Sequence, residues 1–171
     1  MTKNEVRLRY SFRCITEKET EEAIAIEQIC FPPNEACSAK SMRTRILAVP
    51  ELFLVAIDEK LGKIAGFLNG IATNETVFRD EFFSDISLYD PEGQTLMILG
   101  LDVIPEYRGQ GLATAIMSEY LERAAKMEKK LVLLTCLEDK VNMYKKMGFQ
   151  DKGMSGSTWG GEQWHEMSYE L

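Results

Sequence analysis

The sequence lacks several features that large classes of protein require. It has a single histidine, His165, and four cysteines that form no Cys-x-x-Cys pair. We therefore expect neither a structural zinc site nor a histidine-dependent catalytic triad, and we predict no metal ligands. No apolar run approaches the roughly 20 residues of a membrane-spanning helix, and the first residues lack the apolar stretch of a signal peptide. These absences favour a cytoplasmic protein with reduced thiols.

Positive charge is also scarce. The 20 Lys and Arg residues are outnumbered by 27 Asp and Glu residues, which gives a formal net charge of −7. Non-specific binding to nucleic acid or to an anionic membrane needs a basic surface, so we expect neither as a partner. A cationic small molecule would be compatible with this balance, and so would a merely soluble surface.

The apolar pattern predicts one α/β domain over residues 1–171. The chain is 171 residues long and 45% apolar, which is enough for a single domain with its own core. Strand–helix–strand units predict parallel pairing and hairpins predict antiparallel pairing. We therefore predict a mixed, strongly twisted sheet of about 6–7 strands with helices on both faces, in the order β-α-α-β-β-β-α-β-α-β-β.

The limits of these elements follow from the spacing of apolar residues and from capping signals. The predicted strands span 6–13, 52–57, 64–73, 95–104, 131–136, 149–157 and 163–171. The predicted helices span 16–30, 38–47, 112–127 and 139–147. Asp139 is the predicted N-cap of the last helix, and Gly148 is expected to end it in a left-handed conformation.

The most informative segment is LDVIPEYRGQGLAT, residues 101–114, between a buried strand and an amphipathic helix. Its glycines allow a tight turn and a close approach to a ligand. The first amides of a helix have no intrahelical acceptor, so phosphate is their natural ligand. The spacing fits neither a nucleoside triphosphatase phosphate loop nor a dinucleotide fingerprint. A plain glycine-containing turn is the alternative interpretation.

Two motifs resemble the GNAT superfamily of acyl-CoA-dependent N-acyltransferases. The family pattern Arg/Gln-x-x-Gly-x-Gly/Ala is matched by RGQGLA at 108–113, and the pattern Tyr-x-x-x-Gly-Phe by YKKMGF at 144–149. Within the family, CFPPNEA at 30–36 and LTCLED at 134–139 resemble bacterial members of the arylalkylamine (serotonin) N-acetyltransferase branch. Vertebrate members carry two catalytic histidines as His-x-His where this chain has Gly-Leu-Asp at 100–102, so the histidine relay is absent.

The resemblance implies that an acetyl group passes from acetyl-CoA, the co-substrate, to a primary amine by direct attack in a ternary complex. The backbone amides of the glycine segment would hold the pyrophosphate, and the strand before it would pair with the pantetheine arm. The cofactor-binding residues implied in this way are Leu101, Asp102, Val103, Arg108, Gly109, Gln110, Gly111, Leu112, Ala113, Thr114, Asn142 and Tyr144. For Arg108, a role in stabilising the loop is the alternative.

The reaction requires that the amine lose a proton and that the departing thiolate gain one. The resemblance makes Tyr144 the general acid, since a phenol with an ordinary pKa near 10 is protonated at neutral pH. Glu35 is the first candidate base, because insect members of the branch carry a catalytic glutamate there, and Asp102 is the second. The alternatives are a buried aromatic for Tyr144, an exposed loop residue for Glu35, and a solvent-facing or loop-capping residue for Asp102.

The predicted acceptor is a small arylalkylamine or polyamine, and the predicted state is a monomer or homodimer. Two alternatives remain open. The first is a protein or peptide N-acetyltransferase, against which the acidic, irregular segment 74–94 argues because a peptide needs an open groove. The second is a non-catalytic acyl-CoA-binding domain, against which the presence of Tyr144 argues.

Overall fold

The computed structural model describes residues 1–171 and contains five α-helices and a seven-stranded sheet. The helices are α1 (Lys3–Arg9), α2 (Thr20–Cys30), α3 (Ala39–Ala48), α4 (Leu112–Lys126) and α5 (Val141–Lys146). The strands are β1 (Tyr10–Cys14), β2 (Phe53–Asp58), β3 (Lys63–Thr73), β4 (Thr95–Val103), β5 (Leu131–Cys136), β6 (Gln150–Met154) and β7 (His165–Glu170). Their order in the sheet is β1-β2-β3-β4-β5-β7-β6, which confirms the predicted mixed α/β class. None of the helices combines the length and the apolar character that crossing a bilayer requires.

The N-terminal segment corrects the prediction of a strand over residues 6–13. Residues Lys3–Arg9 form α1, and the strand begins only at Tyr10. The cause is a capping box: the Thr2 hydroxyl accepts a hydrogen bond from the Glu5 amide, and the Glu5 carboxylate accepts one from the Thr2 amide. Leu8 is 84% exposed, so the alternation of apolar residues there does not mark a buried face.

The chain divides into two compact units. The first unit comprises Met1–Asn69 and Gly100–Tyr120, and the second comprises Gly70–Leu99 and Leu121–Leu171. Strands β3 and β4 and helix α4 each contribute residues to both units.

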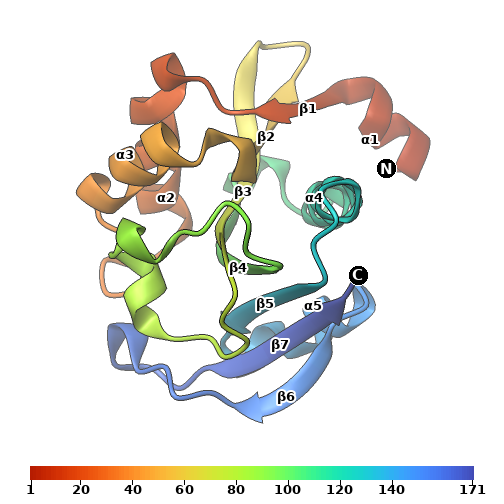
Figure 1. The fold of residues 1–171 in the computed structure, drawn as a ribbon. Coiled ribbons are helices and arrows are strands. Elements are labelled where there is room, and N and C mark those ends of the chain that lie inside the picture. The colour runs from red at the N-terminus through yellow and green to blue at the C-terminus, as the bar shows by residue number, and fades with distance from the viewer. The chain divides into compact units, whose positions relative to one another are not determined.

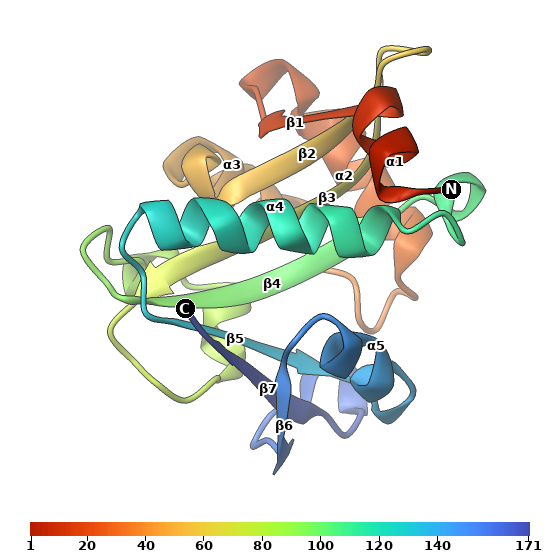
Figure 2. The same ribbon diagram turned by 90° about the vertical axis from the view of Figure 1, so that its right-hand side faces the viewer.

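In the first unit, β2 pairs antiparallel with both β1 and β3. Tyr10 lies opposite Asp58 and Phe53 opposite Asn69, with an irregularity between Ala56 and Ile57. Helices α2 and α3 cover one face of these strands and the beginning of α4 covers the other, as Figures 1 and 2 show. Every residue of β2 is buried, because a strand covered on both faces has no exposed side.

In the second unit, β7 lies between β5 and β6 and pairs antiparallel with both. The parallel pairing of β4 with β5 covers only Thr95–Met97 against Leu131–Leu133. Figure 2 shows α5 beside these strands. The last two strands therefore do not follow chain order across the sheet.

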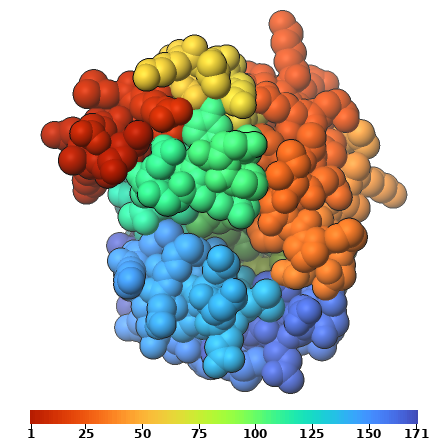
Figure 3. All heavy atoms as spheres, turned by 180° about the vertical axis from the view of Figure 1, so that it is seen from behind, coloured from red at the N-terminus to blue at the C-terminus, as the bar shows by residue number.

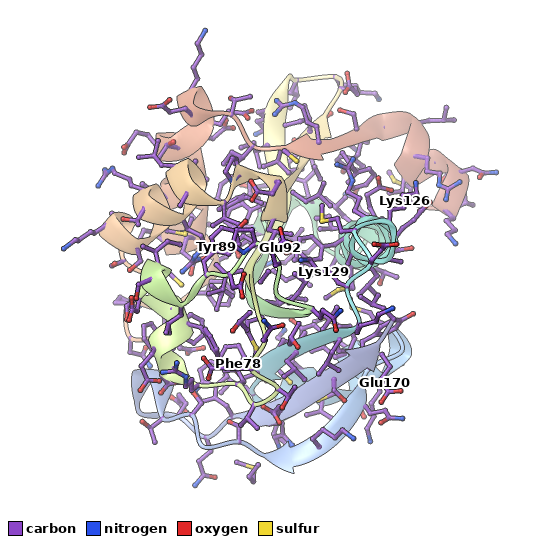
Figure 4. All side chains as sticks on the ribbon, in the orientation of Figure 1. Phe78, Tyr89, Glu92, Lys126, Lys129 and Glu170 are labelled. Carbon is purple, nitrogen blue, oxygen red and sulfur yellow. The ribbon has the colours of Figure 1, made fainter.

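The segment between β3 and β4 is ordered by contacts within the second unit. It contains two short 3-10 helices, Asp80–Phe83 and Ile86–Leu88. The Phe78 amide donates a hydrogen bond of 2.7 Å to Glu166, and the Lys129 ammonium donates to the carbonyls of Pro91 and Gly93. Figure 4 shows Lys129 beside the turn that contains Glu92.

The start of α5 also differs from the prediction. Asp139 does not cap the helix, because a 3-10 turn over Glu138–Lys140 comes first and α5 begins at Val141 without a side-chain cap. The predicted end is confirmed: Gly148 follows the helix with a positive φ of 102°. A side chain there would also lie against Tyr169, since an added Cβ would be 2.9 Å from its ring.

We expect Gly148→Ala to lower the free energy of unfolding by about 1–2 kcal/mol, because a side chain at positive φ costs about that much. The matched control is Gly156→Ala, since Gly156 has no positive φ and no atom within 4 Å of an added Cβ. Urea denaturation followed by circular dichroism measures both variants. Equal unfolding midpoints for the two variants would contradict the assignment of strain to Gly148.

Candidate active site

The glycine segment leads from β4 into α4 through an exposed loop of the first unit. A 3-10 turn over Pro105–Tyr107 is followed by Gly109 and Gly111, whose φ angles are 75° and 82°. No heavy atom lies within 4 Å of a Cβ added at either glycine. Figure 3 shows this segment, in green, at the surface beside the N-terminal residues in red. The two glycines are therefore needed for the positive φ angles of the turn, and not to make room for a neighbouring group.

The backbone amides of this loop are available to a ligand. Those from Gly109 to Thr114 have no backbone acceptor in the chain, and the first amide that is paired belongs to Ala115, which donates to the Gly111 carbonyl at 3.1 Å. These amides lie at the N-terminus of α4, where the helix dipole is positive. The arrangement is suited to an anion such as a phosphate or pyrophosphate.

Buried hydrogen bonds hold the loop in place. The Tyr107 hydroxyl donates to the buried Asp58 carboxylate at 2.6 Å, and the Tyr10 hydroxyl donates to Gln110 at 3.1 Å. Asp58 also accepts from the Lys60 amide and forms an ion pair of 3.5 Å with Arg9. The hydrogen bond from Tyr107 lowers the pKa of Asp58, whereas burial and the carboxylate raise the pKa of Tyr107 to about 12. The phenol therefore stays protonated and keeps donating.

Arg108 makes a contact that stabilises the loop, which is the alternative role considered for it. Its Nε donates to the Val103 carbonyl at 2.9 Å, and the Cys30 thiol reaches the same oxygen at 3.4 Å. The Val103 carbonyl is therefore already occupied within the chain, and Arg108 closes the turn between the end of β4 and the loop.

Asp102, the second candidate base, is completely buried, so it does not face solvent as one alternative supposed. Neither of its carboxyl oxygens has a hydrogen-bond partner, and the same is true of Glu27 Oε1 and Asn69 Nδ2. Burial, followed by the neighbouring Glu27 carboxyl, raises the pKa of Asp102 well above its ordinary value. An unpaired carboxylate in such surroundings favours its protonated form.

These unpartnered atoms converge beside Gly100 on β4. A Cβ added at Gly100 would lie 3.1 Å from Asp102 Oδ1, 3.2 Å from Asn69 Nδ2 and 3.6 Å from Glu27 Oε1. Asn69 is oriented by the buried Arg45, whose Nη1 donates to Asn69 Oδ1 at 2.6 Å. We refer to Glu27, Asn69 and Asp102 as the buried polar cluster.

The remaining candidate residues lie on both units. Glu35 belongs to the first unit, in a turn where its amide donates to the Pro32 carbonyl at 2.9 Å, and its side chain is half-buried. Tyr144 and Asn142 are on α5 in the second unit. Tyr144 is buried and packs edge-to-face against Phe149, with ring centroids 5.9 Å apart, whereas Asn142 is exposed.

The cysteines and the histidine lie in surroundings that suit structural residues better than catalytic ones. All four cysteines are free. Burial raises the pKa of Cys37 to about 11 and of Cys136 to about 12, and it also raises that of Cys30. The ring of His165 lies 3.2 Å from the Asp151 carboxylate in the terminal strands. No group of three or more His, Cys, Asp or Glu side chains is placed to hold a metal ion.

Residues 20–149 match the model of the family described as the acetyltransferase (GNAT) family, which is more than half of the chain. This chain belongs to that family. Serotonin N-acetyltransferase from Mesocricetus auratus is 26% identical over 164 residues, which cover 94% of this chain and 77% of that protein. Membership of the GNAT family implies transfer of an acyl group from coenzyme A and confirms the family resemblance seen in the sequence.

Solved structures show the same fold. The loading GNATL domain of CurA from Lyngbya majuscula superposes with a TM-score of 0.77 at 15% identity, covering 94% of this chain and 97% of that one. The GphF GNAT-like decarboxylase in complex with isobutyryl-CoA gives a TM-score of 0.75 at 17% identity, covering 94% and 98%. The seven-stranded, mostly antiparallel open sheet with five helices is therefore the GNAT fold.

The raised pKa of Asp102 predicts how stability depends on pH. Between the unfolded and the folded pKa, the folded state binds more protons than the unfolded state, so stability falls as pH rises through that window. We expect Asp102→Asn to lose this fall and to be the more stable protein at the upper end, because the amide never carries a buried charge.

Urea midpoints measured from about pH 4 to about pH 8 check this prediction, since the window begins near the ordinary aspartate pKa. Glu106→Gln, which removes an exposed carboxylate, is the control and should follow the unmodified protein. Parallel pH profiles for Asp102→Asn and the unmodified protein would show that Asp102 is ionised in both states.

Proposed function

We propose that this chain is an acetyl-CoA-dependent N-acetyltransferase over residues 1–171 that acetylates a small primary amine. The observation that carries the proposal is the row of backbone amides from Gly109 to Thr114 without an acceptor in the chain, at the N-terminus of α4. The match to serotonin N-acetyltransferase supports an arylalkylamine-like branch, and the CFPPNEA run at 30–36 supports its bacterial members. The acceptor is accordingly an arylalkylamine or a polyamine, and the working form is a cytoplasmic monomer or homodimer.

In this proposal the amides of the glycine loop bind the pyrophosphate of acetyl-CoA. The open space beside Gly109 and Gly111 supports this role, because nothing in the chain covers the backbone there. The backbone of Leu101–Val103 pairs with the pantetheine arm in the manner of an added strand. The pairing is supported by β4, which pairs with β5 only as far as Met97. The Val103 carbonyl is not available for it, because this oxygen already accepts a hydrogen bond from Arg108.

The chemistry assigned to the side chains is one acyl transfer and three proton transfers. Glu35 or Asp102 accepts the proton that the ammonium group releases, and the neutral amine nitrogen then bonds to the thioester carbon as the carbon–sulfur bond breaks. Tyr144 gives its hydroxyl proton to the departing thiolate and regains a proton from the nitrogen as the amide forms. The burial of Tyr144 supports its role, since a phenol shielded from water is a well-placed donor rather than a solvated one.

The acceptor is proposed to be cationic in solution. The net charge of −7 and the carboxyl groups of Glu35 and Asp102 in the first unit favour an ammonium group over an anionic substrate. Acidic surroundings attract the amine in its charged form, and a carboxylate then removes the proton that prevents nucleophilic attack.

We expect Tyr144→Phe to lower kcat by about 100-fold, within the range typical of a general acid, while the affinity for acetyl-CoA is unchanged. Release of coenzyme A thiol measures turnover, and isothermal titration measures binding. Tyr169→Phe is the matched control, because Tyr169 also packs against Phe149 and loses the same hydroxyl. Unchanged turnover in Tyr144→Phe would dismiss the acid role.

A screen of polyamines, arylalkylamines and peptides with acetyl-CoA tests the acceptor class. We expect turnover with at least one class of small amine and none with peptides, because the proposed site recognises a single ammonium group. Turnover confined to peptides would identify a protein N-acetyltransferase instead. Thermal stabilisation by acetyl-CoA without turnover on any acceptor would identify a non-catalytic acyl-CoA-binding domain.

A further inference from the structure

The buried polar cluster presents an electrostatic problem. Glu27 and Asp102 are 2% and 0% exposed, and neither forms an ion pair with a cation. Two ionised carboxylates at close range in a buried site repel each other, and a buried charge without a partner is costly. A single proton held between them removes both difficulties, because the protonated carboxyl becomes a donor and the other an acceptor.

The groups around the pair leave most of its oxygens without a hydrogen bond. Glu27 Oε2 accepts a hydrogen bond of 2.9 Å from the Cys37 amide, whereas Glu27 Oε1, both Asp102 oxygens and Asn69 Nδ2 have no partner. The other titratable groups that face Asp102 are the thiols of Cys30 and Cys37. The nearby cations act on the neighbours of the pair: Arg45 on Asn69 and Cys37, and Arg108 on Cys30.

Gly100 is the residue of β4 that adjoins the pair. This glycine is half-buried, while the three polar atoms lie 3.1–3.6 Å from the place that a Cβ would take. Any larger residue at this position would press on the cluster.

We propose that Glu27 and Asp102 share one proton and together accept a second proton from the acceptor amine through water beside Gly100. This inference rests on the proposed acetyltransferase function and makes Glu27 a member of the base together with Asp102. At rest the pair holds one proton and one negative charge. The ammonium group releases one proton to the pair, and its nitrogen bonds to the thioester carbon as the carbon–sulfur bond breaks. The second proton of the nitrogen replaces the one that Tyr144 gives to the thiolate, and the pair is neutral until it returns its extra proton to solvent.

The first test is independent of activity. Infrared difference spectra of the free protein at neutral pH should show the carbonyl band of a protonated carboxyl group in the unmodified protein. The band should be lost in Asp102→Asn and retained in Glu21→Gln, a control on the exposed side of α2. Absence of the band from the unmodified protein, or its persistence in Asp102→Asn, would overturn the shared proton.

The second test uses the pH dependence of kcat/KM with acetyl-CoA and the best small amine. Glu27→Gln should move the acidic limb of the pH profile to higher pH by about one unit, because the ionised Asp102 no longer shares the proton of a neighbouring carboxyl group and is stabilised less. Glu21→Gln should leave the limb in place. A Glu27→Gln protein that loses activity without moving the limb would show a merely structural role and would overturn the proposal.

Gly100→Ala tests the water beside Gly100 separately from the charge of the pair. We expect it to keep the carbonyl band and to lower kcat at least tenfold, because both carboxyl groups remain while the added methyl group presses on the cluster. Full activity in Gly100→Ala would place the path of the proton elsewhere and contradict the proposal. If no amine is acetylated by any of these proteins, the proposed function fails, whereas the infrared result still decides whether the pair shares a proton.

Discussion

The hydrogen bond from Tyr107 to Asp58 is the interaction on which the arrangement of the glycine loop depends. It joins the loop to the end of β2, and Asp58 binds the following turn through Lys60 and the N-terminal helix through Arg9. A charge-assisted bond of this kind in a buried site is roughly twice as strong as a neutral one. With the loop fixed at its base, its glycines can leave the amides uncovered without letting the backbone collapse onto itself.

The proposed reaction has two charged substrates, the anionic acetyl-CoA and the cationic amine, and different groups of the protein are proposed to bind them. In the proposal, the anionic cofactor binds backbone amides at the start of α4, which carry no formal charge. The cationic amine is proposed to approach the half-buried carboxyl group of Glu35. The excess of acidic residues is therefore compatible with an anionic cofactor, because the cofactor site needs no basic patch.

Much of the fold and the position of the glycine loop could be predicted, because both depend on the spacing of apolar residues and glycines within short segments. The strand, glycine and helix sequence around 101–114 depends on neighbouring residues alone. The α1 helix was missed because the Thr2–Glu5 capping box outweighed an alternation that had no buried face. Glu27 was missed because its importance comes from Asp102 and Asn69, distant in the chain. The sequence did contain one sign that Glu27 is buried: it lies four residues after Ala23 and next to Ile26, on the buried face of α2.

The burial of the thiols has a chemical consequence for a protein that handles coenzyme A. Acyl transfer from coenzyme A leaves a free thiol, which can oxidise to a disulfide and then exchange with cysteines on proteins. Exchange requires the thiolate form, and burial raises the pKa of Cys30, Cys37 and Cys136, so each of them is almost entirely protonated at neutral pH. These three residues are thereby protected from becoming covalently linked to the cofactor through a mixed disulfide.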